Sequence, residues 1–200
     1  KPFWYTREIY HETLMFVGED DEARLLYDAD EILSVLNYGL NVSYEEGSDW
    51  TYRDGIFKRT ASSAIPYWQL DEYYRTEPDA YTIGVDKSKL TVSLEGDRYL
   101  KYGEQDTFTK KQIAVTYTHS EPWEGPVPAG KSDRLPNAIA KIKGGETVKL
   151  LFYGDSISTG CNASGTAQGG NVSPFAPSFP EMVCTYLKER YRADVICENT

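Results

Sequence analysis

The pattern of hydrophobic and polar positions divides this chain into two parts. In the first part, short segments alternate between hydrophobic and polar residues, which is typical of strands with one packed and one solvated face. The clearest segments are 40–44, 90–94 and 113–117. In the last of these we expect Ala114 and Thr116 to face outward. Several short strands at this spacing predict a β-sandwich of the jelly-roll type over residues 1–120.

Turn signals separate these predicted strands. Asp54-Gly55 lies in the middle of the strand-like segment 51–58, which is a strong signal for a hairpin. Residues 95–98 predict a second hairpin turn, directly after the strand at 90–94. Two further segments are plausible strands: 12–17 and 24–27.

Residues 65–74 lie between predicted strands, and after a proline their hydrophobic residues are spaced as in a helix. We predict a short helix or turn that covers one end of the sandwich. The segment contributes three aromatic side chains: Trp68, Tyr73 and Tyr74. These rings could form a platform for a carbohydrate, but burial is the commoner use of aromatic residues, so we favour a hydrophobic plug.

The composition changes after residue 120. Residues 121–130 contain three prolines, which lack backbone donors, so this segment predicts a semi-rigid linker and no strand. Residues 135–143 then have one hydrophobic helical face, and Gly144-Gly145 would end that helix. The linker and the short helix therefore occupy residues 121–146.

The segment 148–152 is a short apolar run that leads into a polar turn, Gly154-Asp155-Ser156. A buried strand with this ending delivers polar side chains to the carboxyl edge of a sheet, where open α/β sheets bind their ligands. Glycine lets the backbone bend sharply at that point, so Ser156 is a candidate nucleophile. The alternative is an ordinary strand-to-loop turn in which Ser156 only caps backbone groups.

A loop, a helix and a second strand follow the turn. Residues 157–177 are rich in Gly, Ser, Asn and Pro, and a long irregular connection inside a compact domain is usually an active-site loop. Three polar residues near its start are candidates for substrate contact: Ser158, Thr159 and Asn162. A capping-box pattern at Ser178 predicts a helix, and residues 194–198 predict a parallel strand. One βαβ unit cannot bury both faces of a parallel sheet, so we expect residues 147–200 to be an incomplete α/β domain that continues beyond Thr200 or in another chain.

The turn and its flanks, Tyr-Gly-Asp-Ser-Ile-Ser at 153–158, resemble the first sequence block of the SGNH (GDSL-type) hydrolases. This resemblance implies a flavodoxin-like α/β/α domain in which Ser156 is the nucleophile and its backbone N–H is the first oxyanion donor. Gly154 and Asp155 would shape the turn beside it.

The other functional residues of that family have no counterpart in this sequence. Family members take two further oxyanion donors, a glycine and an asparagine, from later blocks, and their base from an Asp-x-x-His near the C-terminus. Asn199 is in the wrong block to be the oxyanion asparagine, and both histidines, His11 and His119, belong to the predicted β-domain. We therefore expect these 200 residues to be inactive without a histidine from outside them.

The order of the two parts is similar to that of bacterial family-2 carbohydrate esterases, which carry a jelly roll ahead of the catalytic domain. The resemblance implies a serine esterase that removes acyl groups, in particular acetyl groups, from carbohydrate through an acyl-serine intermediate. Two alternatives stay open: a non-catalytic carbohydrate-binding module in which Ser156 is idle, and an esterase or lipase that acts on small acyl esters.

Composition narrows the classes of partner. A net charge of −10 and a pI near 4.7 argue against nucleic acid and anionic membranes, and no segment is apolar for long enough to span a bilayer. Nucleotide-binding and metal-binding motifs are absent, so no cofactor or metal is predicted. The three cysteines, Cys161, Cys184 and Cys197, are expected to be free and mostly buried thiols. The compartment, cytoplasmic or secreted, stays open.

Overall fold

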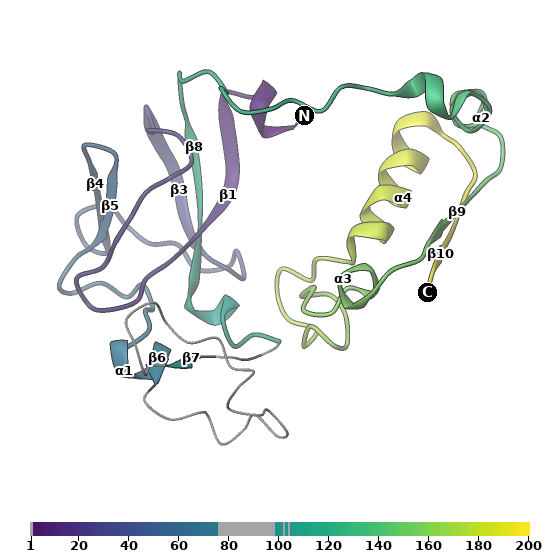
Figure 1. The fold of residues 1–200 in the computed structure, drawn as a ribbon. Helices are drawn as coiled ribbons and strands as arrows, with labels where there is room; N and C mark the ends of the chain where they lie inside the picture. Colours follow the sequence, from purple (N-terminus) through teal and green to yellow (C-terminus); the bar gives the residue numbers. More distant parts are fainter. Residues whose placement is uncertain (1, 76–98, 102, 104) are drawn as a thin grey trace. The chain divides into compact units, whose positions relative to one another are not determined.

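The computed structural model describes residues 2–75, 99–101, 103 and 105–200. Residues 90–94 and 95–98, where the sequence predicts a strand and a hairpin turn, lie outside the described residues. The chain forms two compact units, Lys1–Trp123 and Glu124–Thr200, which we call the first and second unit (Figure 1).

The main sheet of the first unit has three antiparallel strands in the order β1-β8-β3. They are β1 (Glu8–Met15), β3 (Glu31–Asn37) and β8 (Gln112–Thr118). The predicted strand at 113–117 is confirmed, but the expectation that Ala114 and Thr116 face outward is wrong, since both are buried. The reason is that β8 is the central strand and is covered on both faces, so its alternation does not mark a solvated side.

A second antiparallel sheet has the order β2-β5-β4, with β2 (Glu22–Ala23), β4 (Trp50–Arg53) and β5 (Ile56–Arg59). The predicted hairpin is confirmed: Asp54 and Gly55 connect β4 to β5 with φ values of 53° and 74°. Two positive φ angles are what a two-residue hairpin turn requires. A third, smaller pairing joins β6 (Tyr74–Arg75) to β7 (Tyr99–Leu100).

Two predicted strands of the first unit are wrong. Residues 24–27 form no strand, because the strand there, β2, ends at Ala23. Residues 40–44 form a turn and one isolated bridge, and the strand lies before them at β3. The Asn37 side chain determines this turn, since its Oδ1 accepts hydrogen bonds from the backbone N–H groups of Asn41 (3.0 Å) and Val42 (3.1 Å).

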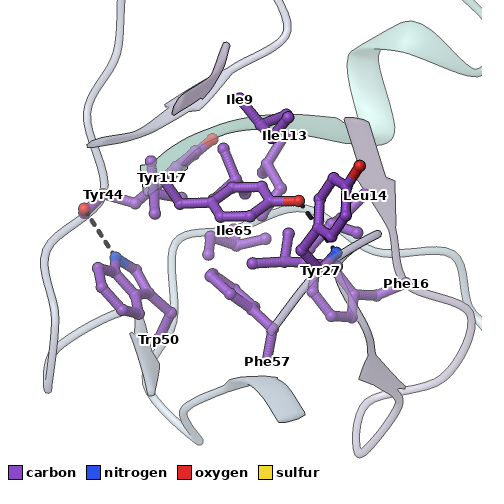
Figure 2. Packing of buried hydrophobic residues seen from close by; sticks show 13 residues of the cluster. Ile9, Leu14, Phe16, Tyr27, Tyr44, Trp50, Phe57, Ile65, Ile113 and Tyr117 are labelled. Atoms are coloured by element: carbon purple, nitrogen blue, oxygen red, sulfur yellow. Dashed lines mark hydrogen bonds between the residues drawn. The ribbon is translucent and has the colours of Figure 1, made fainter. Parts of the chain in front are cut away.

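The core of the first unit takes side chains from both three-stranded sheets, which is compatible with a β-sandwich. The Phe57 ring stacks on Trp50 with centroids 5.2 Å apart, and Trp50 Nε1 donates to the carbonyl oxygen of Tyr44 (2.9 Å; Figure 2). The buried Tyr117 hydroxyl accepts from the backbone N–H of Tyr27 (3.3 Å; Figure 2). Aromatic rings therefore fill much of this core, and the polar atoms of Trp50 and Tyr117 are hydrogen-bonded within it.

Short helices complete the first unit. They are η1 (Phe3–Tyr5), α1 (Leu70–Tyr73) and η3 (Thr109–Lys111). The predicted short helix within 65–74 is confirmed as α1. Trp68, directly before it, is only 5 % exposed, so this ring is part of the interior and fits the plug and not the platform.

The second unit contains one parallel strand pair and the helices around it. The strands are β9 (Val148–Phe152) and β10 (Val195–Asn199), paired from Val195 with Val148 onward. The helical segments are η4 (Ser132–Arg134), α2 (Pro136–Gly144), α3 (Ser156–Thr159) and α4 (Phe179–Tyr191). Figure 1 shows α4 running alongside the β9–β10 pair. The predicted helix, strand, helix and parallel strand of this part are therefore confirmed.

Within the second unit, the described residues cover only one face of the β9–β10 pair. Leu150 and Phe152 pack against the small core that Cys184 and Val195 form with α2 and α4. On the opposite face, Leu151 is 60 % exposed and Ile196 is 46 % exposed. Parallel sheets in stable domains are normally covered on both sides, and the second unit by itself supplies cover for one side of this pair. Among the described residues, no helix is long and apolar enough to cross a membrane.

Candidate functional site

The predicted nucleophile lies in a tight turn directly after β9. Phe152 ends the strand, and Ser156 is the first residue of the single helical turn α3. Asp155 caps this turn, because its Oδ1 accepts a hydrogen bond from the N–H of Ile157 (3.0 Å). Gly160 ends the turn in the left-handed region with φ 83°, a conformation that glycine adopts without strain.

Gly154 is required in this turn for lack of space. A Cβ atom at this position would collide with Ser158 Oγ and lie 2.8 Å from Ser158 Cβ. Carbon atoms in contact normally lie about 3.5–4.0 Å apart, so any larger residue must displace Ser158. The glycine of the Gly-Asp-Ser sequence therefore has a packing reason, and it is not one of the glycines with a positive φ.

Hydrogen bonds of Asn199 and Thr200 tie the turn, and the strand end before it, to the neighbouring strand. Thr200 N–H donates to the Phe152 carbonyl (3.0 Å) and Gly154 N–H donates to the Thr200 carbonyl (3.4 Å). The Asn199 side chain donates through Nδ2 to the carbonyl oxygen of Ser158 (2.6 Å). Sequence reasoning considered Asn199 only as an oxyanion donor and missed this supporting position. An amide side chain at the carboxyl end of the adjacent parallel strand was the signal that could have indicated it.

The Ser156 side chain is exposed and does not cap the helix. Within the described residues its hydroxyl takes part in no hydrogen bond. The group that caps α3 is the Asp155 carboxylate, and Thr159 Oγ1 donates to the backbone carbonyl of Ser156 (3.0 Å). The interpretation of Ser156 as a mere cap therefore does not fit this geometry. The hydroxyl is open to a ligand that approaches from solvent.

Two exposed apolar side chains flank Ser156. Tyr153 is 88 % exposed and Ile157 is 72 % exposed. Large apolar side chains at this exposure, beside a free hydroxyl, offer a contact surface to a bound molecule or to a covering element.

The predicted loop is built of hydrogen-bonded turns. The buried Ser164 accepts from Ala176 N–H at its Oγ (2.8 Å) and from Val172 N–H at its carbonyl (2.8 Å). Of the predicted contact residues, Ser158 and Thr159 lie within α3, and Asn162 is exposed with a φ of 69°. All three are close to Ser156 in the sequence. The backbone carbonyl of Ser158 accepts the hydrogen bond from Asn199.

No histidine belongs to the second unit, since the chain has only His11 and His119. His11 is exposed at an irregularity of β1 with a φ of 55°, and its backbone N–H donates to Thr116 Oγ1 (3.2 Å). His119 is 3 % exposed, and its ring stacks on Tyr27 with centroids 3.7 Å apart. Both histidines therefore belong to the first unit, whereas Ser156 belongs to the second.

Over the described ranges, no cluster of three or more His, Cys, Asp or Glu side chains could hold a metal ion. Comparisons with models of protein families, with curated proteins and with solved structures give no match to this chain. A function for the chain is therefore inferred from its residues and their geometry.

Proposed function

We propose that the second unit carries the nucleophile of a serine ester hydrolase, and that Ser156 is that nucleophile. The observation that supports this most directly is the uncommitted, exposed Ser156 hydroxyl at the carboxyl end of a parallel strand. Asp155 caps the following helical turn in its place. The resemblance to the SGNH hydrolases is the reason for proposing ester hydrolysis as the reaction. With it we propose a jelly-roll fold for the first unit and a flavodoxin-like domain around β9 and β10.

The proposed reaction has two steps. Ser156 Oγ attacks the acyl carbonyl carbon, its proton passes to a base, and the alcohol leaves after it is protonated by that base. Water then hydrolyses the acyl-serine by the same route in reverse. In this proposal the backbone N–H of Ser156, the first residue of α3, donates to the developing oxyanion.

The base must come from an imidazole that can reach Ser156 Oγ. Since neither histidine of this chain belongs to the second unit, the proposal takes the base from polypeptide outside these residues. It would lie on the same sheet edge as Ser156, where the loops of an α/β domain meet.

The proposed substrate is an acylated carbohydrate, with acetyl as the acyl group. Tyr153, exposed next to the turn, can stack on a sugar ring, and the polar residues of the following loop can bind its hydroxyls. The net charge of −10 disfavours acidic polymers as substrates. Small acyl esters would use the same nucleophile.

The test uses the natural protein, together with the polypeptide that the proposal requires to supply the base. We expect acetate release from acetylated oligosaccharides, and a fall in kcat on the order of 10⁴–10⁶ in Ser156→Ala. The matched control is Ser62→Ala, which alters an exposed serine of the first unit and should keep full activity. A brief reaction with p-nitrophenyl acetate, stopped with acid, should leave one acetyl group on the peptide that contains Ser156. Full activity in Ser156→Ala, or an acetyl group on another residue, would contradict the proposal.

A second candidate function, a carbohydrate-binding module, is favoured by a cavity of about 630 Å³ in the first unit. Its lining combines polar groups with apolar surface: Val17, Gly18, Glu19, Asp20, Asp21, Gln69, Leu70 and Asp71. Carboxylate and amide groups bind sugar hydroxyls well, although Asp21 already accepts from the N–H groups of Val17 (2.7 Å) and Glu22 (2.9 Å).

Calorimetric titration separates the two functions. If the cavity binds carbohydrate, Asp20→Asn with Asp71→Asn should weaken binding of plain oligosaccharides and leave ester hydrolysis unchanged. If the chain only positions Ser156, plain oligosaccharides should show no binding that depends on these two residues.

A further inference from the structure

Two of the three cysteines of the chain meet where α4 packs on β10. Cys184 on α4 is 3 % exposed, and Cys197 on β10 packs against the same small core. Cys197 Sγ lies 3.7 Å from the carbonyl oxygen of Pro180. Pro180 and Cys184 are four residues apart, so they lie on the same face of α4. Cys197 contacts Pro180 on that face, and the two thiols are therefore neighbours in the contact between α4 and β10.

The two thiols differ in accessibility. Burial, together with the neighbouring Cys197 thiol, raises the pKa of Cys184 to about 11, so Cys184 is kept as the neutral thiol. Cys197 is only partly buried. Since the thiolate is the attacking species, the more accessible Cys197 is the thiol that an oxidant meets first.

We propose that Cys184 and Cys197 are a dithiol pair which a small-molecule disulfide oxidises to an intramolecular disulfide that links α4 to β10. The Cys197 thiolate attacks oxidised glutathione, forms a mixed disulfide and releases one glutathione thiolate. Cys184 gives up its proton as its sulfur attacks the Cys197 sulfur, and the second glutathione is released. Two protein thiols lose two electrons, one glutathione disulfide gains them, and the two protons pass to the two glutathione thiolates.

The link would act on the strand that supports the serine turn. Residue Asn199, two positions after Cys197, holds the Ser158 carbonyl. A covalent tie between α4 and β10 restricts the movement of this strand end in the folded state. The proposal itself is independent of the proposed esterase function, because it concerns only the two thiols.

The third cysteine serves as an internal control. Cys161 lies two residues after the end of α3, and its backbone N–H donates to the Ser156 carbonyl (2.8 Å). It is not a member of the core that contains the other two cysteines. Cys161 should therefore keep its thiol under conditions in which the pair is oxidised.

The test treats the folded chain with oxidised glutathione and counts thiols after denaturation. The reduced chain has three thiols, and we expect one to remain after oxidation. Trypsin cuts at Arg192, between Cys184 and Cys197, and a protease specific for glutamate cuts at Glu181, between Cys161 and Cys184. Mass spectrometry of the unreduced double digest should then show one linked pair of peptides, with Cys161 alkylated. The oxidised chain should also lose its helical circular dichroism at a higher temperature than the reduced chain.

Two comparisons make the result decisive. Cys161→Ser should lose both of its thiols, whereas Cys197→Ser should form no intramolecular disulfide in the folded chain. Oxidation in denaturant should remove the preference for the Cys184–Cys197 pair, because the folded contact produces it. Retention of three thiols, a linked peptide that contains Cys161, or disulfide-linked dimers alone would overturn the proposal.

Discussion

Gly154→Ala is the substitution that most directly tests the geometry of the serine turn. The added Cβ would collide with Ser158 Oγ and lie 2.8 Å from Ser158 Cβ. Ser158 would have to shift by about 1 Å to restore normal carbon–carbon contact. That shift strains the 2.6 Å hydrogen bond from Asn199 to the Ser158 carbonyl. Overpacking of this kind costs about 2 kcal/mol of stability.

Two optical signals allow the effect to be assigned to one unit. All four tryptophans belong to the first unit: Trp4, Trp50, Trp68 and Trp123. Of the described helices, the long ones, α2 and α4, belong to the second unit. Thermal unfolding followed by helical circular dichroism should therefore shift down by roughly 10 °C in Gly154→Ala, since 1 kcal/mol corresponds to several degrees in a unit of this size. The transition seen by tryptophan fluorescence should not move.

Two further variants control for the substitution itself. Gly130→Ala adds the same methyl group where no atom lies within 4 Å and should leave both transitions in place. Ser158→Gly, introduced into Gly154→Ala, removes the colliding atoms and should recover most of the lost stability. If Gly154→Ala is as stable as Gly130→Ala, or if Ser158→Gly does not rescue it, the steric account of the turn is wrong.

Three other predictions follow from single side chains. Asn199→Ala removes the donor to the Ser158 carbonyl and should lower the free energy of unfolding of the second unit by about 1 kcal/mol, measured by helical circular dichroism in urea. Asn199→Asp should be destabilised at least as much, because a carboxylate cannot donate this hydrogen bond. His119→Phe keeps a ring stacked on Tyr27 and removes two buried nitrogens that have no described hydrogen-bond partner. The free energy of unfolding, followed by tryptophan fluorescence, should be unchanged or higher by about 1 kcal/mol. A clear loss of stability would indicate that the imidazole has a hydrogen-bond partner. Burial, and next the hydrogen bond to Glu12, raise the pKa of Tyr117 above its usual 10.0, so the folded chain keeps a proton that the unfolded chain releases. Stability should hold below pH 10 and fall above it, and the fall should be shallower in Tyr117→Phe when unfolding is measured across that range.

Where a few neighbouring residues determine the backbone, the sequence alone was sufficient. The Asp54-Gly55 hairpin, the capped helix that begins after Ser178 and the strand before Gly154 were all predicted at or near their observed positions. Each depends on local chemistry: positive φ at the turn, a side chain that satisfies helix N–H groups, or an apolar run of strand length. The position of Ser156 after a strand follows from the same local signals.

The tertiary structure alone decided which faces are buried and which distant residues meet. Ala114 and Thr116 are buried because both faces of β8 are covered, which their own alternation cannot show. The contact of Asn199 with Ser158 joins residues far apart in the sequence, and it exists only because β9 and β10 are parallel neighbours. Local preference is encoded within a few residues, whereas burial and long-range hydrogen bonds depend on the pairing of strands across the whole unit. For that reason the sequence could indicate the turn that carries Ser156 but not the side chain that holds this turn in place.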